Sequence, residues 1–173
     1  ATQDAEVLLA CLPDIAAVEE VFLGKGGVIE NARPGQILVD HSTVGIKTSR
    51  ACADAAEKKG GLFLDAPISG GTERATDGTL TIMVGGKAEV FDRCRPVLET
   101  MGKRITRVGP AGSGQTVKAC NQIMCAVNQV AVSEALSLCH RAGIDLDVLA
   151  SIVPVSAGAS RAFLGIPDGV FTG

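Results

Sequence analysis

The feature that most constrains the fold is a regular alternation of short apolar runs with longer, Ala-rich amphipathic stretches. Short runs with almost no charge suit strands that are buried on both faces of a parallel sheet. The amphipathic stretches between them suit helices that cover those faces. This order predicts an α/β fold with a parallel sheet and right-handed crossovers. We predict strands at residues 7–12, 37–40, 62–65, 80–84 and 104–108.

The stretches between these strands carry signals for where helices begin and end. Asp14 can cap a helix that continues to Leu23 and stops at Gly24. A second helix follows the polar turn at residues 41–43 and continues to about Lys59. A third helix reaches Leu98, and Pro96 predicts that it is bent or begins late.

Beyond Gly114 the strand signal disappears. Residues 115–142 indicate one long helix, and residues 146–153 indicate a shorter one. We therefore predict a sheet-containing domain at residues 1–111 and a helical part at residues 112–173. The last ten residues, 164–173, show no helical pattern.

Composition excludes several classes of function. Hydrophobic residues make up 46% of the chain and charged residues 20%, which is typical of globular proteins. A net charge of −3, scattered basic residues and 3% aromatic residues argue against nucleic-acid binding. The sequence has no uncharged apolar run of about 18 residues and no secretory signal pattern. Six cysteines without a CxxC pair, and two histidines, disfavour a metal site. We expect a reduced, cytoplasmic protein without metal, nucleic-acid or membrane partners.

The long helix carries an unusual polar stripe. At 100° per residue, one face collects Lys118, Asn121, Gln122, Cys125 and Gln129, and Lys118 is the one charge between Thr116 and Ser133. A solvent-facing stripe usually holds Glu and Lys, whereas this one holds amides around a single cation. The stripe is either partly exposed surface or the wall of a wet cleft. In a cleft, Lys118 could act as a general acid or base.

A glycine-rich segment, Gly109 to Thr116, precedes the same helix. A phosphate-binding P-loop would need Lys where Gln115 stands, so an NTPase is disfavoured. A dinucleotide fingerprint would need a small residue where Val117 stands. The glycines still expose backbone N–H groups at a helix N-terminus, which favours an anion nearby.

A third feature directly follows the strand at residues 62–65. Ser69 offers a hydroxyl, and Gly70 and Gly71 offer two unshielded N–H groups. Together these three residues could form a carboxylate cradle at the carboxyl end of a strand, where open α/β sheets bind ligands. The alternative is an ordinary Pro-Gly turn.

Two long motifs then occur in a meaningful order. The run DAPISGGTERATDGTLTIMVGG at 65–86, followed by GSGQTVKACNQ at 112–122, resembles the β-hydroxyacid dehydrogenase family. That family includes 3-hydroxyisobutyrate dehydrogenase and tartronate semialdehyde reductase. The motifs CLPD at 11–14 and DHST at 40–43 also match, and the resemblance extends to about Arg161.

The resemblance implies an incomplete Rossmann-type sheet joined by a long helix to part of an all-helical domain. It implies a hydride transfer between NAD or NADP and a short 3-hydroxy acid or semialdehyde, in a homo-oligomer. Lys118 would be the catalytic acid or base, and the cradle would hold the substrate carboxylate. Asn121 would orient the substrate or Lys118, as the family's Asn after that Lys does, and Gln122, also expected to bind substrate, stands four residues after the Lys as in the tartronate semialdehyde reductase pattern. Leu12, Pro13 and Thr43 match positions near the cofactor.

The sequence also departs from the family pattern. Ala1 enters at what resembles the family's fourth strand, so the glycine fingerprint and the acidic residue that selects NAD fall outside it. The family's last helices are missing as well. Arg74 stands where the family usually has Gly, either as a surface charge or as a sign of a more anionic substrate.

Two hypotheses of different class follow. The first is a 3-hydroxy acid dehydrogenase or reductase that uses Lys118. The second is an inactive piece of such an enzyme that serves only as a folding or interaction module and does not bind the cofactor.

Overall fold

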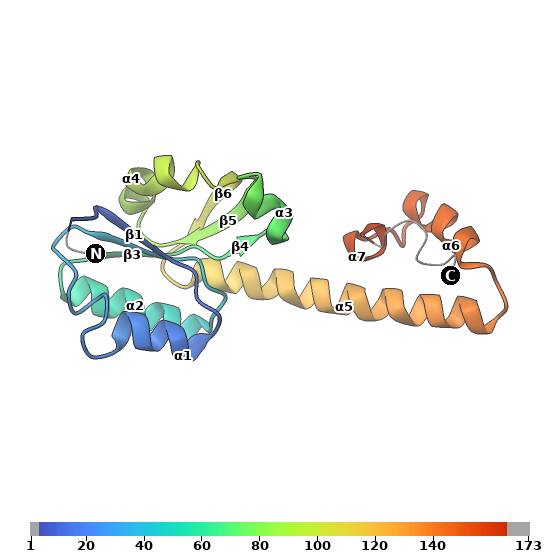
Figure 1. Ribbon diagram of the computed structural model, residues 1–173, viewed down its shortest axis with the longest axis horizontal. Coiled ribbons are helices and arrows are strands. Elements are labelled where there is room, and N and C mark those ends of the chain that lie inside the picture. The colour runs from blue at the N-terminus through green and yellow to red at the C-terminus, as the bar shows by residue number, and fades with distance from the viewer. Residues whose placement is uncertain (1–3, 166–173) are drawn as a thin grey trace. The chain divides into compact units, whose positions relative to one another are not determined.

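The structure, a computed structural model, describes residues 4–165. The chain divides into two compact units, residues 1–119 and residues 120–173. The first unit holds a six-stranded sheet and its helices, and the second is helical (Figure 1). The predicted boundary near residue 112 stays a prediction.

Three parallel strands form one half of the sheet, and all three end at the same level. They are β1 (Val7–Ala10), β2 (Ile37–Asp40) and β3 (Leu62–Asp65). Their last residues pair in register, Ala10 with Asp40 and Asp40 with Asp65. The loops that follow the three strands therefore begin side by side at one edge of the sheet.

The predicted α/β fold is confirmed, but the other half of the sheet departs in part from the predicted parallel course. Strand β5 (Leu80–Gly85) runs antiparallel to β3 and to the short strand β4 (Ile68–Ser69), which the sequence did not predict. Strand β6 (Gly102–Gly109) is parallel to β5. Only residues 70–79 join β4 to β5, and a parallel crossover needs a dozen or more. That segment holds one short helix, α3 (Gly71–Thr76), also not predicted, and returns the chain antiparallel.

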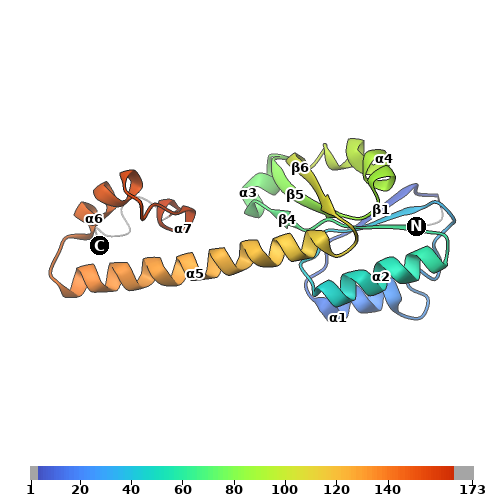
Figure 2. The ribbon, with the colours of Figure 1, turned by 180° about the vertical axis from the view of Figure 1, so that it is seen from behind.

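Helices cover both faces of the sheet (Figures 1 and 2). One face carries α1 (Ile15–Val18), its π-helical continuation η1 (Glu19–Leu23) and α2 (Ile46–Lys58). The other face carries α4 (Ala88–Leu98). As predicted, Asp14 caps α1 by accepting a hydrogen bond from the Ala17 amide. The late start predicted from Pro96 is wrong, because α4 begins at Ala88 and Pro96 lies in its last turn, where the proline removes one hydrogen bond close to the helix end.

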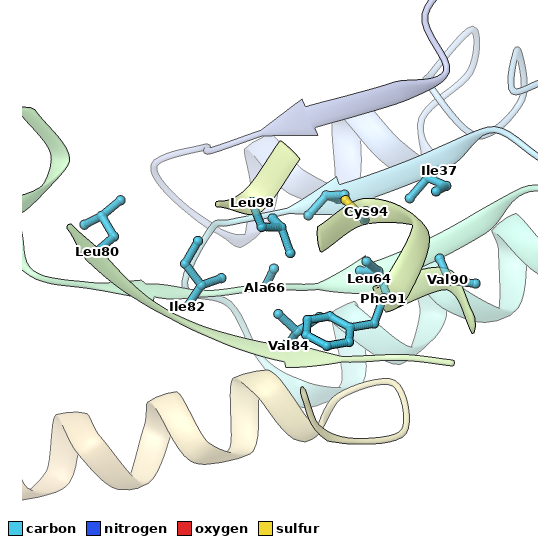
Figure 3. Packing of buried hydrophobic residues seen from close by; sticks show 11 residues of the cluster. Ile37, Leu64, Ala66, Leu80, Ile82, Val84, Val90, Phe91, Cys94 and Leu98 are labelled. Carbon is cyan, nitrogen blue, oxygen red and sulfur yellow. The ribbon is translucent and has the colours of Figure 1, made fainter. Parts of the chain in front are cut away.

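Two apolar clusters, one on each face, hold these layers together. On the α4 face, Phe91 and Leu98 pack on Leu64 and Val84 of the central strands (Figure 3). On the opposite face, Phe22 meets Phe63 edge to face, with ring centroids 5.7 Å apart. Neighbouring residues of β3 thus enter opposite clusters, as the period of two in a strand requires.

Two of the cysteines behave as small apolar residues. Cys52 and Cys94 are fully buried, one in each cluster. Burial raises the pKa of the Cys52 thiol to about 12 and that of the Cys94 thiol to about 11. Cys11, Cys120 and Cys125 are exposed instead.

The long helix α5 (Ser113–Arg141) begins in the first unit and continues into the second. The second unit adds α6 (Leu146–Ile152), η2 (Val153–Val155) and α7 (Arg161–Leu164), the last of which was not predicted. The remainder of the predicted non-helical tail, 166–173, lies outside the described residues.

Within the described residues, α5 is the one helix long and apolar enough to cross a membrane. Its most apolar 18-residue window has a mean hydropathy of 1.2. Core helices of water-soluble proteins can have the same length and apolar composition. Length and composition alone therefore do not identify α5 as a membrane span.

Candidate active site

The site begins with Asp65, the last residue of β3, whose side chain is completely buried. Its two carboxylate oxygens accept hydrogen bonds from the backbone amides of Gly112 (2.7 Å) and Gln115 (3.0 Å). These amides belong to the start of α5, where N–H groups have no partner within the helix. The anion that the glycine-rich segment favours is therefore the protein's own Asp65, which leaves these amides no role in holding a phosphate.

Burial raises the pKa of Asp65, and the amide hydrogen bonds, led by those from Gly112 and Gln115, oppose the rise. Both oxygens accept from N–H donors, so the contacts are those of an ionised carboxylate.

Gln115 makes a second attachment between α5 and the sheet. Its side chain, 2% exposed, donates from Nε2 to the Ser42 carbonyl (2.8 Å) and accepts at Oε1 from the Val44 amide (3.2 Å). The first turn of α5 is therefore tied to the carboxyl ends of both β3 and β2. From the sequence, Gln115 stands out only as the residue in place of the P-loop Lys, and this structural role was not predicted.

The close approach of α5 to the sheet requires a glycine at position 114. A Cβ at this position would lie 2.5 Å from the Met83 carbonyl oxygen and 2.6 Å from the Asp65 carbonyl oxygen. The glycine-rich segment thus permits packing against backbone.

These attachments place Lys118 one turn further along α5. Lys118 is 8% exposed, and its Nζ donates to the Ile68 carbonyl oxygen at 2.8 Å. Ile68 immediately precedes Ser69 in β4, so the ammonium lies beside the predicted carboxylate cradle. A lysine pointing into bulk solvent would have contradicted the cleft interpretation.

The cradle itself has the backbone that its glycines suggested. Gly70 and Gly71 have φ values of 151° and 69°, in the range that favours glycine. A Cβ on Gly71 would meet nothing within 4 Å, so the space beside this amide is open. Ser69 pairs with Thr81 of β5, which fixes the position of the cradle on the sheet.

The predicted cofactor positions lie on the two loops next to this edge. Leu12 follows β1, and its amide donates to the Ser42 hydroxyl at 2.8 Å. Pro13 and Thr43, on the loops after β1 and β2, are exposed. All three residues lie at the carboxyl ends of adjacent parallel strands, which is where open α/β sheets bind ligands.

Asn121 and Gln122 follow Lys118 on α5 but belong to the second unit. The Asn121 amide donates to Gln122 Oε1 at 3.2 Å, and it also contacts Cys125 Sγ at 3.8 Å. Both contacts lie along the predicted polar stripe. Within residues 4–165, no group of three or more His, Cys, Asp or Glu side chains could hold a metal ion.

His41 is a further residue of this edge that the sequence analysis did not single out. Its Nδ1 lies 2.7 Å from the Ala66 carbonyl oxygen, and its backbone amide donates to Ala10. Because a carbonyl oxygen only accepts, Nδ1 carries the proton, and the buried Nε2 has no hydrogen-bond partner in the structure. Burial lowers the pKa of His41, against smaller opposing effects of Ala66 and Asp40.

Comparisons with known proteins identify the family of this chain. Residues 1–109 match the family model for the NAD binding domain of 6-phosphogluconate dehydrogenase. Residues 112–172 match the model for the NAD-binding domain of NADP-dependent 3-hydroxyisobutyrate dehydrogenase.

Individual relatives match over most of this chain. A 3-hydroxyisobutyrate dehydrogenase of Pseudomonas aeruginosa is 41% identical, over 92% of this chain and 54% of the relative. A 2-hydroxy-3-oxopropionate reductase of Escherichia coli is 43% identical, over 83% of this chain and 49% of the relative. The structure of Mycobacterium tuberculosis 3-hydroxyisobutyrate dehydrogenase with L-serine superimposes with a TM-score of 0.86 at 36% identity, covering 93% of this chain and 54% of that one. The chain thus spans about half the length of these relatives.

The close packing at Gly114 yields a stability prediction. Gly114→Ala forces the start of α5 away from two backbone carbonyls, and we expect it to lower the free energy of unfolding by about 1–3 kcal/mol. Urea denaturation measures this change. Gly158→Ala is the matched control, because a Cβ there meets nothing within 4 Å. Equal effects of the two substitutions would contradict the packing argument.

The lowered pKa of His41 yields a pH prediction. Below about pH 6.5 the unfolded chain binds a proton at His41 that the folded chain resists, so folding stability falls as the pH falls from 7 to 5. In His41→Gln, the part of this fall in folding stability that comes from His41 should disappear. Urea denaturation at several pH values measures it. His140→Gln, at an exposed position of α5, should keep the full loss. Parallel losses in wild type and His41→Gln would contradict the prediction.

Proposed function

Because the chain belongs to the β-hydroxyacid dehydrogenase family, we propose that it comes from an enzyme that transfers a hydride between NAD or NADP and a short 3-hydroxy acid or its semialdehyde. The relatives' names describe this chemistry, and the L-serine in the Mycobacterium structure is itself a 3-hydroxy acid. The observation that carries the proposal is the buried Lys118 ammonium, 2.8 Å from the carbonyl of the residue before Ser69.

The carboxylate cradle holds the substrate's acid group. The Ser69 hydroxyl and the Gly70 and Gly71 amides are hydrogen-bond donors, and the open space beside Gly71 admits a ligand. Charge-assisted hydrogen bonds to a carboxylate are stronger than neutral ones and fix its orientation. The hydroxyl-bearing carbon, two bonds from the carboxylate carbon, is thereby placed next to the cradle.

Lys118 moves the proton. During oxidation its neutral amine takes the proton of the substrate hydroxyl, and during reduction its ammonium returns a proton to the carbonyl oxygen. The Ile68 carbonyl accepts one N–H bond in either state, so it holds Nζ in place throughout. Asn121 and Gln122, three and four residues further on, bind or orient the substrate.

Leu12, Pro13 and Thr43 contribute to holding the nicotinamide cofactor. When bound, the cofactor supplies or accepts the hydride at the substrate's hydroxyl-bearing carbon. Leu12 and Pro13 offer an apolar surface and Thr43 offers a hydroxyl, from the loops after β1 and β2. The residues described here leave both NAD and NADP as candidates.

The relatives are named as a dehydrogenase and a reductase, which favours an enzyme over a piece that serves only as a folding or interaction module. Among the described residues, α5 also exposes a row of large apolar side chains, which supports the predicted homo-oligomer: Ile123, Met124, Val127, Val130 and Leu138. Cytoplasmic localisation stays a prediction.

The role of Lys118 is tested by its removal. In the full-length enzyme, Lys118→Ala should lower kcat/KM for 3-hydroxy acid oxidation by about 100- to 10,000-fold, because the proton acceptor is lost. The change in nicotinamide absorbance measures the rate. Lys103→Ala, at an exposed position of β6, is the control and should keep wild-type activity. A Lys118→Ala enzyme with an unchanged rate would remove this residue from the mechanism.

A further inference from the structure

We propose that Arg74 makes the cradle a site for substrates that carry a second carboxylate, so that the preferred 3-hydroxy acid is a dicarboxylate. This inference rests on the proposed function and assigns its substrate class. Two observations support it: the Arg74 side chain packs against the cradle, and it has no ion pair with another described residue.

Arg74 lies directly over the cradle. It belongs to α3, which begins inside the cradle at Gly71 and leads from β4 toward β5 (Figure 1). The Arg74 Cβ and Cδ atoms lie 2.6 and 2.8 Å from the point where a Cβ on Gly70 would be. Leu80 approaches the same point to 3.1 Å, at the edge of the apolar cluster in Figure 3. The aliphatic stem of Arg74 therefore packs against the cradle backbone, and its guanidinium follows two bonds beyond Cδ.

The charge of this arginine is not neutralised by the protein. Among residues 4–165, the Arg74 side chain has no ion-pair or hydrogen-bond partner, although the acidic residues Glu73 and Asp77 are close in sequence. The residue is partly buried. An arginine that is partly buried and has no such partner beside the proposed carboxylate cradle is well placed to pair with a ligand carboxylate.

The proposed site holds the two carboxylates of one ligand at two different places. One carboxylate occupies Ser69, Gly70 and Gly71, beside Lys118, which leaves Lys118 to the hydroxyl. A second carboxylate, carried on a short chain from the same carbon, reaches Arg74. A monocarboxylate fills only the first site, so discrimination depends on Arg74.

Two substrates that differ only in this group test the proposal. 3-Hydroxyisobutyrate carries a methyl group where 2-(hydroxymethyl)glutarate carries a two-carbon arm that ends in a carboxylate. With the full-length enzyme and saturating cofactor, we expect kcat/KM to favour the dicarboxylate. Arg74→Gln should lower the ratio of the two kcat/KM values by roughly 10- to 100-fold, as expected for the loss of hydrogen bonds to a charged group. Arg74→Lys should lower it less, because it keeps the charge but not the paired donors.

A matched control distinguishes the effect of the charge at position 74 from the effect of removing any positive charge from the protein. Arg93 lies on α4, and it bonds to the Gly35 carbonyl before β2, at the edge of the sheet opposite the cradle. Arg93→Gln removes the same charge, and the ratio should stay at the wild-type value. An unchanged ratio in Arg74→Gln, or a wild-type enzyme that prefers the monocarboxylate, would overturn the proposal while leaving the dehydrogenase function intact.

Calorimetric binding of 2-(hydroxymethyl)glutarate distinguishes failure of the inference from failure of the proposed function. If neither compound is oxidised or reduced, the proposed function is wrong. A dissociation constant raised roughly 10-fold or more by Arg74→Gln, and not by Arg93→Gln, would still support the second-carboxylate site. Equal dissociation constants for the wild type and Arg74→Gln would refute it.

Discussion

The site depends on one interaction, the attachment of the Asp65 carboxylate to the first turn of α5. Without it, the N–H groups at the helix start would lack a partner, and Lys118 would lose its fixed distance from the sheet. The buried carboxylate is costly by itself, as the direction of its pKa shift indicates. Four backbone amides compensate for part of that cost, and the helix start gains a capping anion in return.

The register of the sheet lets this single attachment organise the whole edge. Because β1, β2 and β3 end at the same level, their loops bring Leu12, Ser42 and Ala66 together without a long connection. Gln115 joins α5 to the loop after β2, and Asp65 joins it to the end of β3. The proposed cofactor positions, the proposed cradle and Lys118 are thus attached to the same edge of one sheet, and a fixed arrangement of this kind is what orientation of a small substrate requires.

The sequence predicts where the strands lie better than it predicts whether they run parallel or antiparallel. The apolar runs at 37–40 and 62–65 are buried on both faces and bounded by polar turns, so their positions could be read directly. The run at 80–84 looks the same in either direction, and its antiparallel course depends on the short segment before it. A two-residue strand such as β4 carries no periodicity at all.

The candidate site divides in a similar way. Lys118 stands out because it is the one charge on a long apolar stretch of its helix, and the glycines of the cradle stand out because Ser69 precedes them shortly after a predicted buried strand. The contacts of Asp65 with Gly112 and Gln115 join residues that are 47 and 50 positions apart in the sequence. No local sequence pattern predicts contacts at such a separation. For Gln115 the sequence offers no comparable signal, because its burial is visible only in the structure, whereas a His directly after a predicted buried strand was the signal for His41.

The account as a whole requires that the substrate hydroxyl meets Lys118 while the acid group occupies Ser69, Gly70 and Gly71. The most direct measurement is a crystal structure of the full-length protein with a nicotinamide cofactor and a 3-hydroxy acid. We predict Lys118 Nζ at about 2.6–3.2 Å from the hydroxyl oxygen and the carboxylate on the Ser69 hydroxyl and the glycine amides. A substrate bound in the opposite orientation, or beyond the reach of Lys118, would contradict the central claim.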